Sequence, residues 1–323
     1  MVSNRQPDKT MSVSQRLIGL CTALSIRQAH FVATLEDDWH ELATTHSGVV
    51  ASLSLVCPNA ASLDAILNLD CPVRILHGEQ ANGLESLREA TAKHPGVSLD
   101  LLSEYKGLLW SDVAAEHPQE VIRTILAATA NSCVANTQRD LPKEGEIYGI
   151  TYRTRGDGPP LFLLPLALAP SQWDPVIDTL AEHFTVILLG GAEVGTVARL
   201  ETRGRCIGYR EMVIRALERS HISQAHQILD VGCGTGVATR LIASYCPEGA
   251  QVTAVDVNRY LLHEASALVD PDDLVGSIEF RPANAEMLDF ANNTFDLSFS
   301  MTVMEEVTAE TMLSEMARVT RPG

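Results

Sequence analysis

The chain has 323 residues, of which 46% are hydrophobic and 20% charged, and its net charge at pH 7 is −17. This composition is typical of a globular protein of about two domains. The acidic excess argues against binding to nucleic acid, because contacts to phosphates need clustered Lys and Arg side chains.

The cysteines and the hydropathy of the chain indicate the cellular compartment in which the protein is expected. The seven cysteines are odd in number, scattered and without a C-x-x-C pair, which argues against a disulfide framework and against a metal site. The N-terminal residues are polar and contain no apolar signal core. The most apolar stretch, residues 159–170, is too short and too proline-bounded to span a bilayer. We therefore expect a cytoplasmic protein with no membrane partner.

Helical spacing of apolar residues alternates with short apolar runs along residues 12–130. Predicted helices cover residues 12–24, 36–45, 64–69, 83–93 and 118–130. Predicted strands cover residues 29–33, 49–57, 72–76 and 97–102. Strands that alternate with helices in this way predict an α/β fold with a mostly parallel sheet.

This order of elements resembles the C-terminal half of an α/β-hydrolase, in a degenerate form that covers residues 1–135. The resemblance places the family's nucleophile elbow at residues 33–37, its acid near Ala81 and its histidine near Gly107. A working elbow needs a serine on a strained, glycine-flanked turn, and Leu35 stands in its place. We expect Leu35 to be a packed residue and this region to hydrolyse nothing. Other polar residues nearby, none on such an elbow, are Ser47, Ser103, Asp112 and His117. We expect His77 to be a buried histidine at a strand end rather than a base.

Residues 136–198 are predicted to hold a linker and a second α/β-hydrolase-like segment, with residues 131–146 as the polar linker candidate. The segment resembles the beginning of the hydrolase fold, with strands at 150–154, 160–165 and 184–189, a hairpin turn at 155–158 and a helix at 172–183. The hydrolase pieces are thus in reversed order. Either a tandem ancestor was cut at both ends, or the second segment supplies strands missing from the first in a permuted sheet.

The most informative stretch is residues 228–240, ILDVGCGTGVATR. A short apolar strand pattern ends at Asp230 and leads into a glycine cluster and a helix pattern over residues 237–245. Glycines adopt positive φ without a Cβ clash and let the backbone approach a ligand. A second strand pattern, residues 251–255, ends at Asp256, where a carboxylate can accept both hydroxyls of a ribose.

These features resemble the S-adenosylmethionine (SAM) site of class I methyltransferases of the type 11, or UbiE-like, group. The resemblance covers residues 199–323 and implies a Rossmann-like domain with SAM as cofactor. Asn284 takes the place of an Asp that accepts the adenine amino group and keeps a carbonyl acceptor. The cofactor-binding residues that it implies are Asp230, Gly232, Cys233, Gly234, Gly236, Asp256, Val257, Asn284, Ala285 and Ser300.

The remaining elements of this region complete the expected site. An amphipathic helix over residues 199–220 corresponds to the family's lid helix, with Tyr209 and Arg210 as candidate contacts to the cofactor or the substrate. A helix at 261–268, strands at 278–281 and 295–300, and a helix at 308–318 follow.

The implied reaction is methyl transfer from SAM to an acceptor, and we expect a small molecule in that role. Little covalent work by the protein is needed, and a base only if the acceptor loses a proton. The candidate catalytic residues are Glu305, Glu306 and Tyr209. Alternatively, Glu305 and Glu306 are solvated residues at the start of a helix. Glu286 is expected to cap a loop rather than to act in catalysis. Two alternatives are a hydrolase with an unrecognised triad and an inactive SAM-binding scaffold.

The sequence ends where a class I domain would continue into its fifth strand. We therefore expect a domain incomplete at its C-terminus that lacks its last strands. An open sheet edge exposes unpaired backbone groups and favours self-association.

Overall fold

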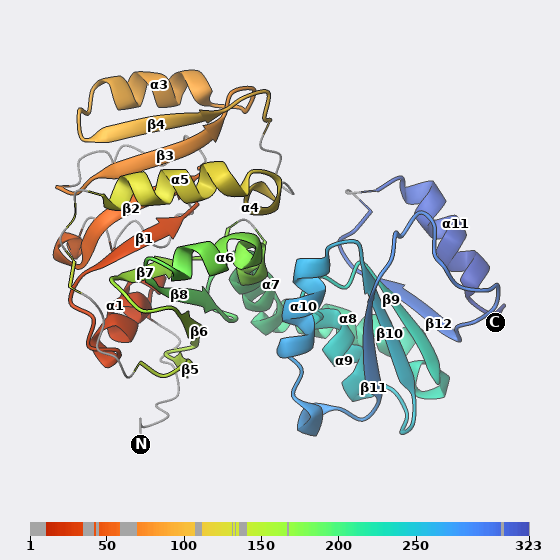
Figure 1. Ribbon diagram of the computed structural model, residues 1–323. Helices are drawn as coiled ribbons and strands as arrows, with labels where there is room; N and C mark the ends of the chain where they lie inside the picture. Colours follow the sequence, from red (N-terminus) through yellow and green to blue (C-terminus); the bar gives the residue numbers. More distant parts are fainter. Residues whose placement is uncertain are drawn as a thin grey trace. The chain divides into compact units, whose positions relative to one another are not determined.

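The structure is a computed structural model that describes residues 11–34, 42, 45–58, 70–106, 112–130, 132, 134–135, 141–166, 168–304 and 307–322. The chain divides into two compact units, Met1–Thr196 and Val197–Gly323, called here the first and the second unit. Each unit has its own sheet with helices packed on it (Figure 1).

The described elements of the first unit alternate between helices and strands for most of its length. They are α1 (Val13–Ala23), β1 (Ala29–Ala33), η1 (Ser47–Val49), β2 (Val50–Val56), β3 (Val73–Gly78), α3 (Leu84–Ala92), β4 (Val97–Leu102), α4 (Val113–Glu116), α5 (Pro118–Thr129), β5 (Glu144–Ile147), β6 (Ile150–Arg155), β7 (Pro160–Leu163), η3 (Pro170–Trp173), α6 (Asp174–Ala181) and β8 (Thr185–Gly190).

One eight-stranded sheet joins both segments of the first unit. Its order is β4-β3-β2-β1-β7-β8-β6-β5, so β1 of the first segment pairs in parallel with β7 of the second. The neighbouring strands in the part of the sheet ordered β4-β3-β2-β1-β7-β8 are all parallel. Strand β6 runs antiparallel to both of its neighbours, β8 and β5. Of the two arrangements that the sequence left open, the structure has the one in which the second segment extends the sheet of the first.

Alternating side chains of these strands build a core on each face of the sheet. Phe31 and Phe162 point to the face covered by α1 and α3, and their rings stack with centroids 5.1 Å apart. The neighbouring Val32 and Leu161 point to the opposite face, which α5 and α6 cover (Figure 1). Since both cores contain residues of both segments, each segment buries its apolar side chains against the other.

Two predictions for residues 144–158 were wrong. Residues 155–158 are not a hairpin turn, because β6 and β7 are not neighbours in the sheet. The hairpin instead joins β5 to β6 through Tyr148 and Gly149, whose φ values of 54° and 78° suit a two-residue turn of mirror-image type. Residues 144–146, predicted as linker, therefore belong to strand β5 (Glu144–Ile147). The Tyr148 carbonyl accepts a hydrogen bond from the buried Arg16, which also pairs with Glu193 at 3.4 Å.

Some predictions for the first unit fall on residues outside those described. They are the helix at 64–69, most of the helix at 36–45, and the positions of Leu35 and Gly107. The predicted buried histidine, His77, is 3% exposed, and its Nδ1 lies 3.1 Å from the Gly78 carbonyl oxygen. Among the described helices, none combines the length and the apolar character needed to cross a membrane.

The second unit repeats a strand–helix order along most of its length. Its elements are α7 (Gly195–Arg205, beginning two residues before the unit), α8 (Ile207–Arg219), η4 (Ile222–Gln224), β9 (Gln227–Val231), α9 (Val237–Tyr245), β10 (Gln251–Asp256), α10 (Arg259–Ala267), η5 (Pro271–Asp273), β11 (Ser277–Pro282), β12 (Leu297–Ser300) and α11 (Ala309–Val319).

Its four-stranded sheet has the order β11-β10-β9-β12, and all described pairs are parallel. Val213 and Leu217 of α8 pack with Ile228 of β9 on one face. Met312 of α11 packs with Leu229 on the opposite face. The sheet is thus covered on both faces, as continuous apolar parallel strands require.

The predicted single helix over residues 199–220 is two helices. Cys206 separates α7 from α8 with an extended backbone, φ −67° and ψ 123°. The two helices are held by different contacts: Glu201 of α7 pairs with Arg240, whereas Val213 and Leu217 of α8 enter the core. A break lets both sets of contacts form, which one straight amphipathic helix would not.

Lowering the pH should destabilise the first unit through His30. This side chain is 2% exposed, its Nδ1 lies 2.8 Å from Ser52 Oγ, and burial lowers its pKa from 6.5 to about 4. In this pH range the His30 imidazole binds a proton in the unfolded chain but not in the folded unit. The free energy of unfolding therefore decreases as the pH drops from about 6.5 towards 4. Urea unfolding at pH 7 and pH 5, followed by tryptophan fluorescence, should show a smaller loss in His30→Gln than in the wild type.

The readout is specific, because all three tryptophans, Trp39, Trp110 and Trp173, lie in the first unit. Equal losses in the two proteins would contradict the assignment to His30.

Candidate functional site

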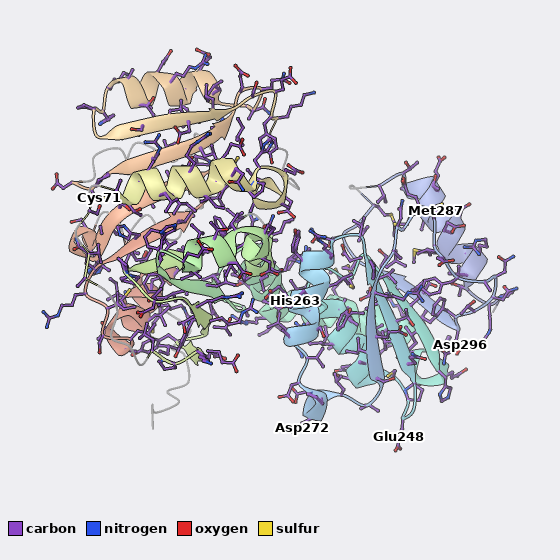
Figure 2. All side chains as sticks on the ribbon, viewed as in Figure 1. Cys71, Glu248, His263, Asp272, Met287 and Asp296 are labelled. Carbon is purple, nitrogen blue, oxygen red and sulfur yellow. The ribbon has the colours of Figure 1, made fainter. Side chains whose placement is uncertain are left out.

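The predicted cofactor residues gather at the carboxyl ends of the strands of the second unit. Because the strands are parallel, the segments that follow β9, β10, β11 and β12 all leave the sheet at the same edge. Met287, which follows β11, and Glu248, which precedes β10, lie at opposite ends of this unit (Figure 2). The sequence therefore placed its site residues at one edge of one sheet.

A glycine turn links β9 to α9. Gly232, Gly234 and Gly236 have φ values of 72°, 55° and 77°, in the region that favours glycine. The N–H groups of Gly232 and Cys233 donate to the Val255 carbonyl at 2.7 and 3.0 Å, which fixes the turn against β10. The predicted glycine motif is thus a tight turn that leads into a helix N-terminus.

Asp256 lies directly beside this turn. Its carboxylate accepts hydrogen bonds from the N–H groups of Gly234 and Asn258, both at 2.8 Å. Burial raises its pKa, and these backbone hydrogen bonds oppose the rise. Each carboxylate oxygen has a further lone pair, so both can still accept a hydrogen bond from a ligand.

Asp230 lies beneath the turn and is 1% exposed. Thr239 Oγ1 donates to its carboxylate at 2.6 Å. Burial, together with the charge of Asp256, raises the pKa of Asp230 to about 7, even though the Thr239 hydrogen bond lowers it. The two predicted acids therefore form one electrostatically linked pair, in which the buried member titrates near neutral pH.

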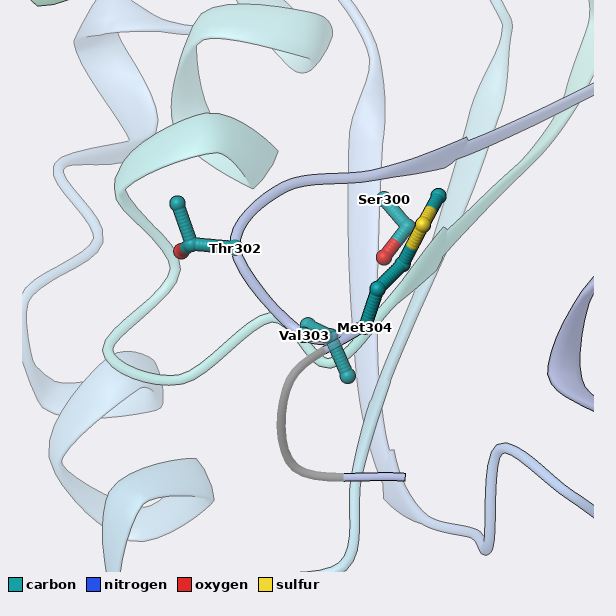
Figure 3. A pocket seen from close by; sticks show the side chains of 4 residues that line it. All are labelled: Ser300, Thr302, Val303 and Met304. Atoms are coloured by element: carbon teal, nitrogen blue, oxygen red, sulfur yellow. The ribbon is translucent and has the colours of Figure 1, made fainter. Parts of the chain in front are cut away.

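A cavity of about 410 Å³ opens at the end of β12, next to the turn. Ser300, Thr302, Val303 and Met304 line it (Figure 3). Ser300 Oγ donates to the Val231 carbonyl at 2.8 Å, which ties this loop to β9. Thr302 has a φ of 58°, an uncommon value for a β-branched residue and a mark of local strain.

Three other predicted cofactor residues lie along the same edge. Val257 is 80% exposed and follows Asp256 directly. Asn284 Oδ1 accepts the Glu286 N–H at 2.9 Å, so its amide oxygen closes a local turn and keeps one lone pair. Ala285, the next residue, is partly buried against the core on the α11 face of the sheet.

Cys233 is 8% exposed and packs with Ala254 and Leu262. Burial raises the pKa of its thiol, which keeps the sulfur in the unreactive protonated form. Cys233 is therefore a packing residue of the turn.

The candidate catalytic residues are only partly placed. Tyr209, in α8, is half-buried, and Arg203 lies over its ring at 5.3 Å from the centroid. Burial raises the pKa of Tyr209, Arg203 lowers it and Asp230 raises it, so Tyr209 lies within electrostatic reach of the buried acid. Glu305 and Glu306 are outside the described residues. Glu286 accepts the Thr308 N–H at 2.6 Å, in the loop-capping role predicted for it.

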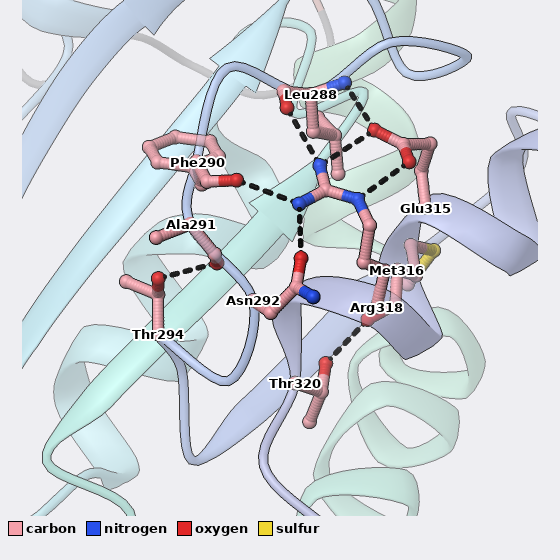
Figure 4. Close-up of polar contacts among 9 residues, drawn as sticks. All are labelled: Leu288, Phe290, Ala291, Asn292, Thr294, Glu315, Met316, Arg318 and Thr320. Atoms are coloured by element: carbon pink, nitrogen blue, oxygen red, sulfur yellow. Dashed lines mark hydrogen bonds and ion pairs between the residues drawn. The ribbon is translucent and has the colours of Figure 1, made fainter.

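An arginine of α11 holds the loop that carries Asn284 and its neighbours. Arg318 donates to the carbonyls of Leu288 and Phe290, both at 2.8 Å, and to the carboxylate of Glu315 (Figure 4). Glu315 in turn accepts the Leu288 N–H at 2.8 Å, and these hydrogen bonds lower its pKa to about 2. The loop is therefore fixed to a helix, although no motif in the sequence indicated these two residues.

The sequence also gave no sign of the contacts that hold the glycine turn. Thr239 binds Asp230, and Glu201 and Arg240 bind Thr235 within the turn. Glu201 is 34 residues from Thr235 in the chain. Polar residues on amphipathic helices usually face solvent, so their pairing could not be read from spacing alone.

Comparison with known proteins agrees with this geometry. Residues 228–323 match a family model described as "Methyltransferase domain". The second unit is thus similar to methyltransferase domains over these residues. The matched residues contain the glycine turn, Asp256 and the loop at the end of β12. The match agrees with the methyltransferase class that the sequence predicts.

Several named relatives share this domain. O-methyltransferase resE of Aspergillus sclerotiorum is 36% identical over 102 residues, covering 31% of this chain and 38% of the relative. Methyltransferase GfsG of Streptomyces halstedii is 34% identical over 113 residues, covering 35% and 40%. Ubiquinone/menaquinone biosynthesis C-methyltransferase UbiE of Hydrogenovibrio crunogenus is 28% identical over 109 residues, covering 33% and 43%. The chain thus spans about two fifths of the length of these curated relatives.

Gly232→Ala should destabilise the second unit more than Gly249→Ala. Both glycines have a similar left-handed φ, 72° and 76°, so both alanines carry the same backbone cost of ~1–2 kcal/mol. A Cβ at Gly232 would lie 2.2 Å from Val303 Cγ2, whereas a Cβ at Gly249 meets nothing within 4 Å. Thermal unfolding of the two variants measures the difference, and equal melting temperatures would contradict a tight contact between the turn and the cavity loop.

Raising the pH should weaken the second unit through Asp230. Its folded pKa of about 7 lies above the ordinary value of 3.8, so the folded unit holds a proton that the unfolded chain releases. Stability should therefore fall as the pH rises from about 4 to about 7. Asp230→Asn keeps an acceptor for Thr239 and should flatten this slope, measured by hydrogen exchange of α9 peptides in urea. A slope unchanged in the variant would contradict the raised pKa.

Proposed function

We propose that the second unit binds SAM at the glycine turn and transfers its methyl group to a small-molecule acceptor. The observation that supports this most strongly is the position of Asp256. Its carboxylate lies against the Gly234 N–H, so a ribose bound by Asp256 would also lie against the glycine backbone. The match of residues 228–323 to a methyltransferase domain supports the same function.

The residues present fit this cofactor. Among the described residues, a Cβ at Gly234 would meet only Leu200 Cδ1 within 4 Å, at 3.6 Å, which leaves room for a ligand at this part of the backbone. Asp256 would accept the ribose hydroxyls, and Asn284 Oδ1 and the backbone near Ala285 would contact the adenine. Val257, exposed beside Asp256, offers an apolar side chain to the purine. Bound SAM supplies an electrophilic methyl on a positively charged sulfur.

The acceptor would occupy the cavity at the end of β12. Its volume of about 410 Å³ lies within the range of small-molecule sites, which is roughly 300–1,000 Å³. Val303 and Met304 would exclude water, and the Thr302 hydroxyl offers one polar contact. Holding acceptor and methyl at reacting distance in such a cavity is the main contribution asked of the protein. Among the relatives, resE is named an O-methyltransferase and UbiE a C-methyltransferase.

We also propose that the first unit is a degenerate α/β-hydrolase-like fold with its segments in permuted order. Strands β1–β4 come from the segment that resembles the hydrolase C-terminal half, and β5–β8 from the segment that resembles its beginning. The single sheet formed by both supports a permutation over two incomplete copies. With Leu35 in the place of the nucleophile, we expect no hydrolysis by this unit.

Asp256→Asn should weaken SAM binding by roughly tenfold or more, because hydrogen bonds to a charged group contribute ~1.5–3 kcal/mol. Asp296→Asn is a matched control. Asp296 also accepts two backbone N–H groups, from His226 and Gln227 at 2.9 and 2.8 Å, but it lies where β9 begins, away from the glycine turn. Isothermal titration with SAM compares the variants with the wild type.

The expected result is loss of affinity in Asp256→Asn alone. Unchanged SAM binding by Asp256→Asn would overturn the ribose assignment. SAM binding by the wild type without methyl transfer to any of a panel of hydroxylated, amino and carbon-acid acceptors would favour a SAM-binding scaffold instead.

A further inference from the structure

Three residues from separate elements close a polar ring around the glycine turn. Glu201 of α7 accepts a hydrogen bond from Thr235 Oγ1 at 2.8 Å. Arg240 of α9 donates to both carboxylate oxygens of Glu201, at 2.9 and 2.7 Å, and to the Thr235 carbonyl at 2.7 Å. Glu201 and Thr235 are only 9% and 1% exposed, and the Arg240 side chain is 21% exposed, so the ring is largely but not fully sheltered from water.

The turn depends on this ring for its outer support. Its three glycines have no side chains, and Cys233 points into the packing with Ala254 and Leu262. Thr235 is the remaining side chain of the turn, and both its hydroxyl and its carbonyl are taken by the ring. Glu201 and Arg240 therefore hold the turn through Thr235.

The same ring also fixes the position of α7 next to α9, because Glu201 belongs to α7 and Arg240 to α9. Gly204, near the end of α7, lies so close to α9 that a Cβ there would be 2.5 Å from Val237 Cγ1. Arg203, next to Gly204, lies over the ring of Tyr209. Because Tyr209 is within electrostatic reach of Asp230, a shift of α7 would move Arg203 relative to the acids of the cofactor site.

A purely stabilising role explains the ring poorly. The Glu201–Arg240 pair is partly buried, and such an ion pair gains little net stability, because removing its charges from water offsets much of their attraction. Fixing the arrangement of neighbouring elements is the better attested use of such pairs. Here the elements so fixed are the turn and the helix that precedes the methyltransferase sheet.

We infer that, in the SAM-binding unit proposed above, Glu201 and Arg240 are positioning residues that lock the glycine turn and α7 into the cofactor-binding arrangement. Neither side chain needs to touch SAM. Because both the turn and α7 are held by the same ring, SAM binding and the docking of α7 are linked: SAM should protect α7 from hydrogen exchange, and loosening α7 should weaken SAM binding.

Glu201→Gln tests this with little change in shape, since the amide keeps an acceptor for Thr235 but loses the charge that pairs with Arg240. Arg240→Lys keeps the charge and loses the forked geometry. Glu211→Gln is the matched control, because it breaks the Arg215–Glu211 pair of α8, which is exposed and separated by 3.4 Å. Each variant is characterised by SAM titration calorimetry, thermal unfolding without SAM, and hydrogen exchange of peptides from residues 197–205.

We expect roughly tenfold weaker SAM binding in Glu201→Gln and an intermediate loss in Arg240→Lys. Glu211→Gln should bind as the wild type does. Without SAM, exchange of residues 197–205 should be faster in Glu201→Gln, and SAM should slow it in the wild type.

If the wild type binds SAM and Glu201→Gln binds it with the same affinity, the positioning role is wrong, while the proposed function stands. So would weaker binding without faster exchange in α7, because the turn and the helix would then not be linked. A wild type that fails to bind SAM would overturn the proposed function, and the role of the ring with it.

Discussion

The hydrogen bond from the Gly234 N–H to the Asp256 carboxylate is the contact on which the second unit's site depends. It joins the ends of β9 and β10, the two central strands of the sheet. The bond forms only because the glycine turn adopts positive φ and exposes its N–H groups. A carboxylate held in this way is already oriented towards the space above the turn, so little ordering is left for a ligand to impose.

Burial of charge is the cost of this arrangement. Burial raises the pKa values of both Asp230 and Asp256, and the charge of Asp256 also disfavours ionisation of Asp230. Thr239, the backbone N–H groups of Gly234 and Asn258, and the helix N-terminus offset part of that cost. A cationic ligand would relieve more of it, because a positive charge nearby favours the ionised carboxylates. The positively charged sulfur of SAM has this property.

The first unit follows a different constraint. Neither segment of its sheet can bury its apolar strands alone: Phe31 of β1 stacks on Phe162 of β7, and Trp173, fully buried, packs in the core shared with Val32 and Leu76. The buried Arg16 ties α1 to the turn of the β5–β6 hairpin and to Glu193. Two separate segments can share one sheet because parallel strands are joined by crossovers whose ends lie at the surface.

The sequence by itself determined the local elements and the chemistry of one site. Periodicity placed α9 and most strands of both units within a few residues, and the glycine cluster identified the turn that precedes α9, because both depend on the backbone preferences of neighbouring residues. Only the tertiary structure decided the strand pairing, in which β1 pairs with β7, and β6 with β5 and not β7. It also decided that residues 195–219 form two helices and that Glu201, Arg240 and Arg318 hold the loops of the site. These contacts join residues far apart in the chain, and they form only once packing has brought their elements together.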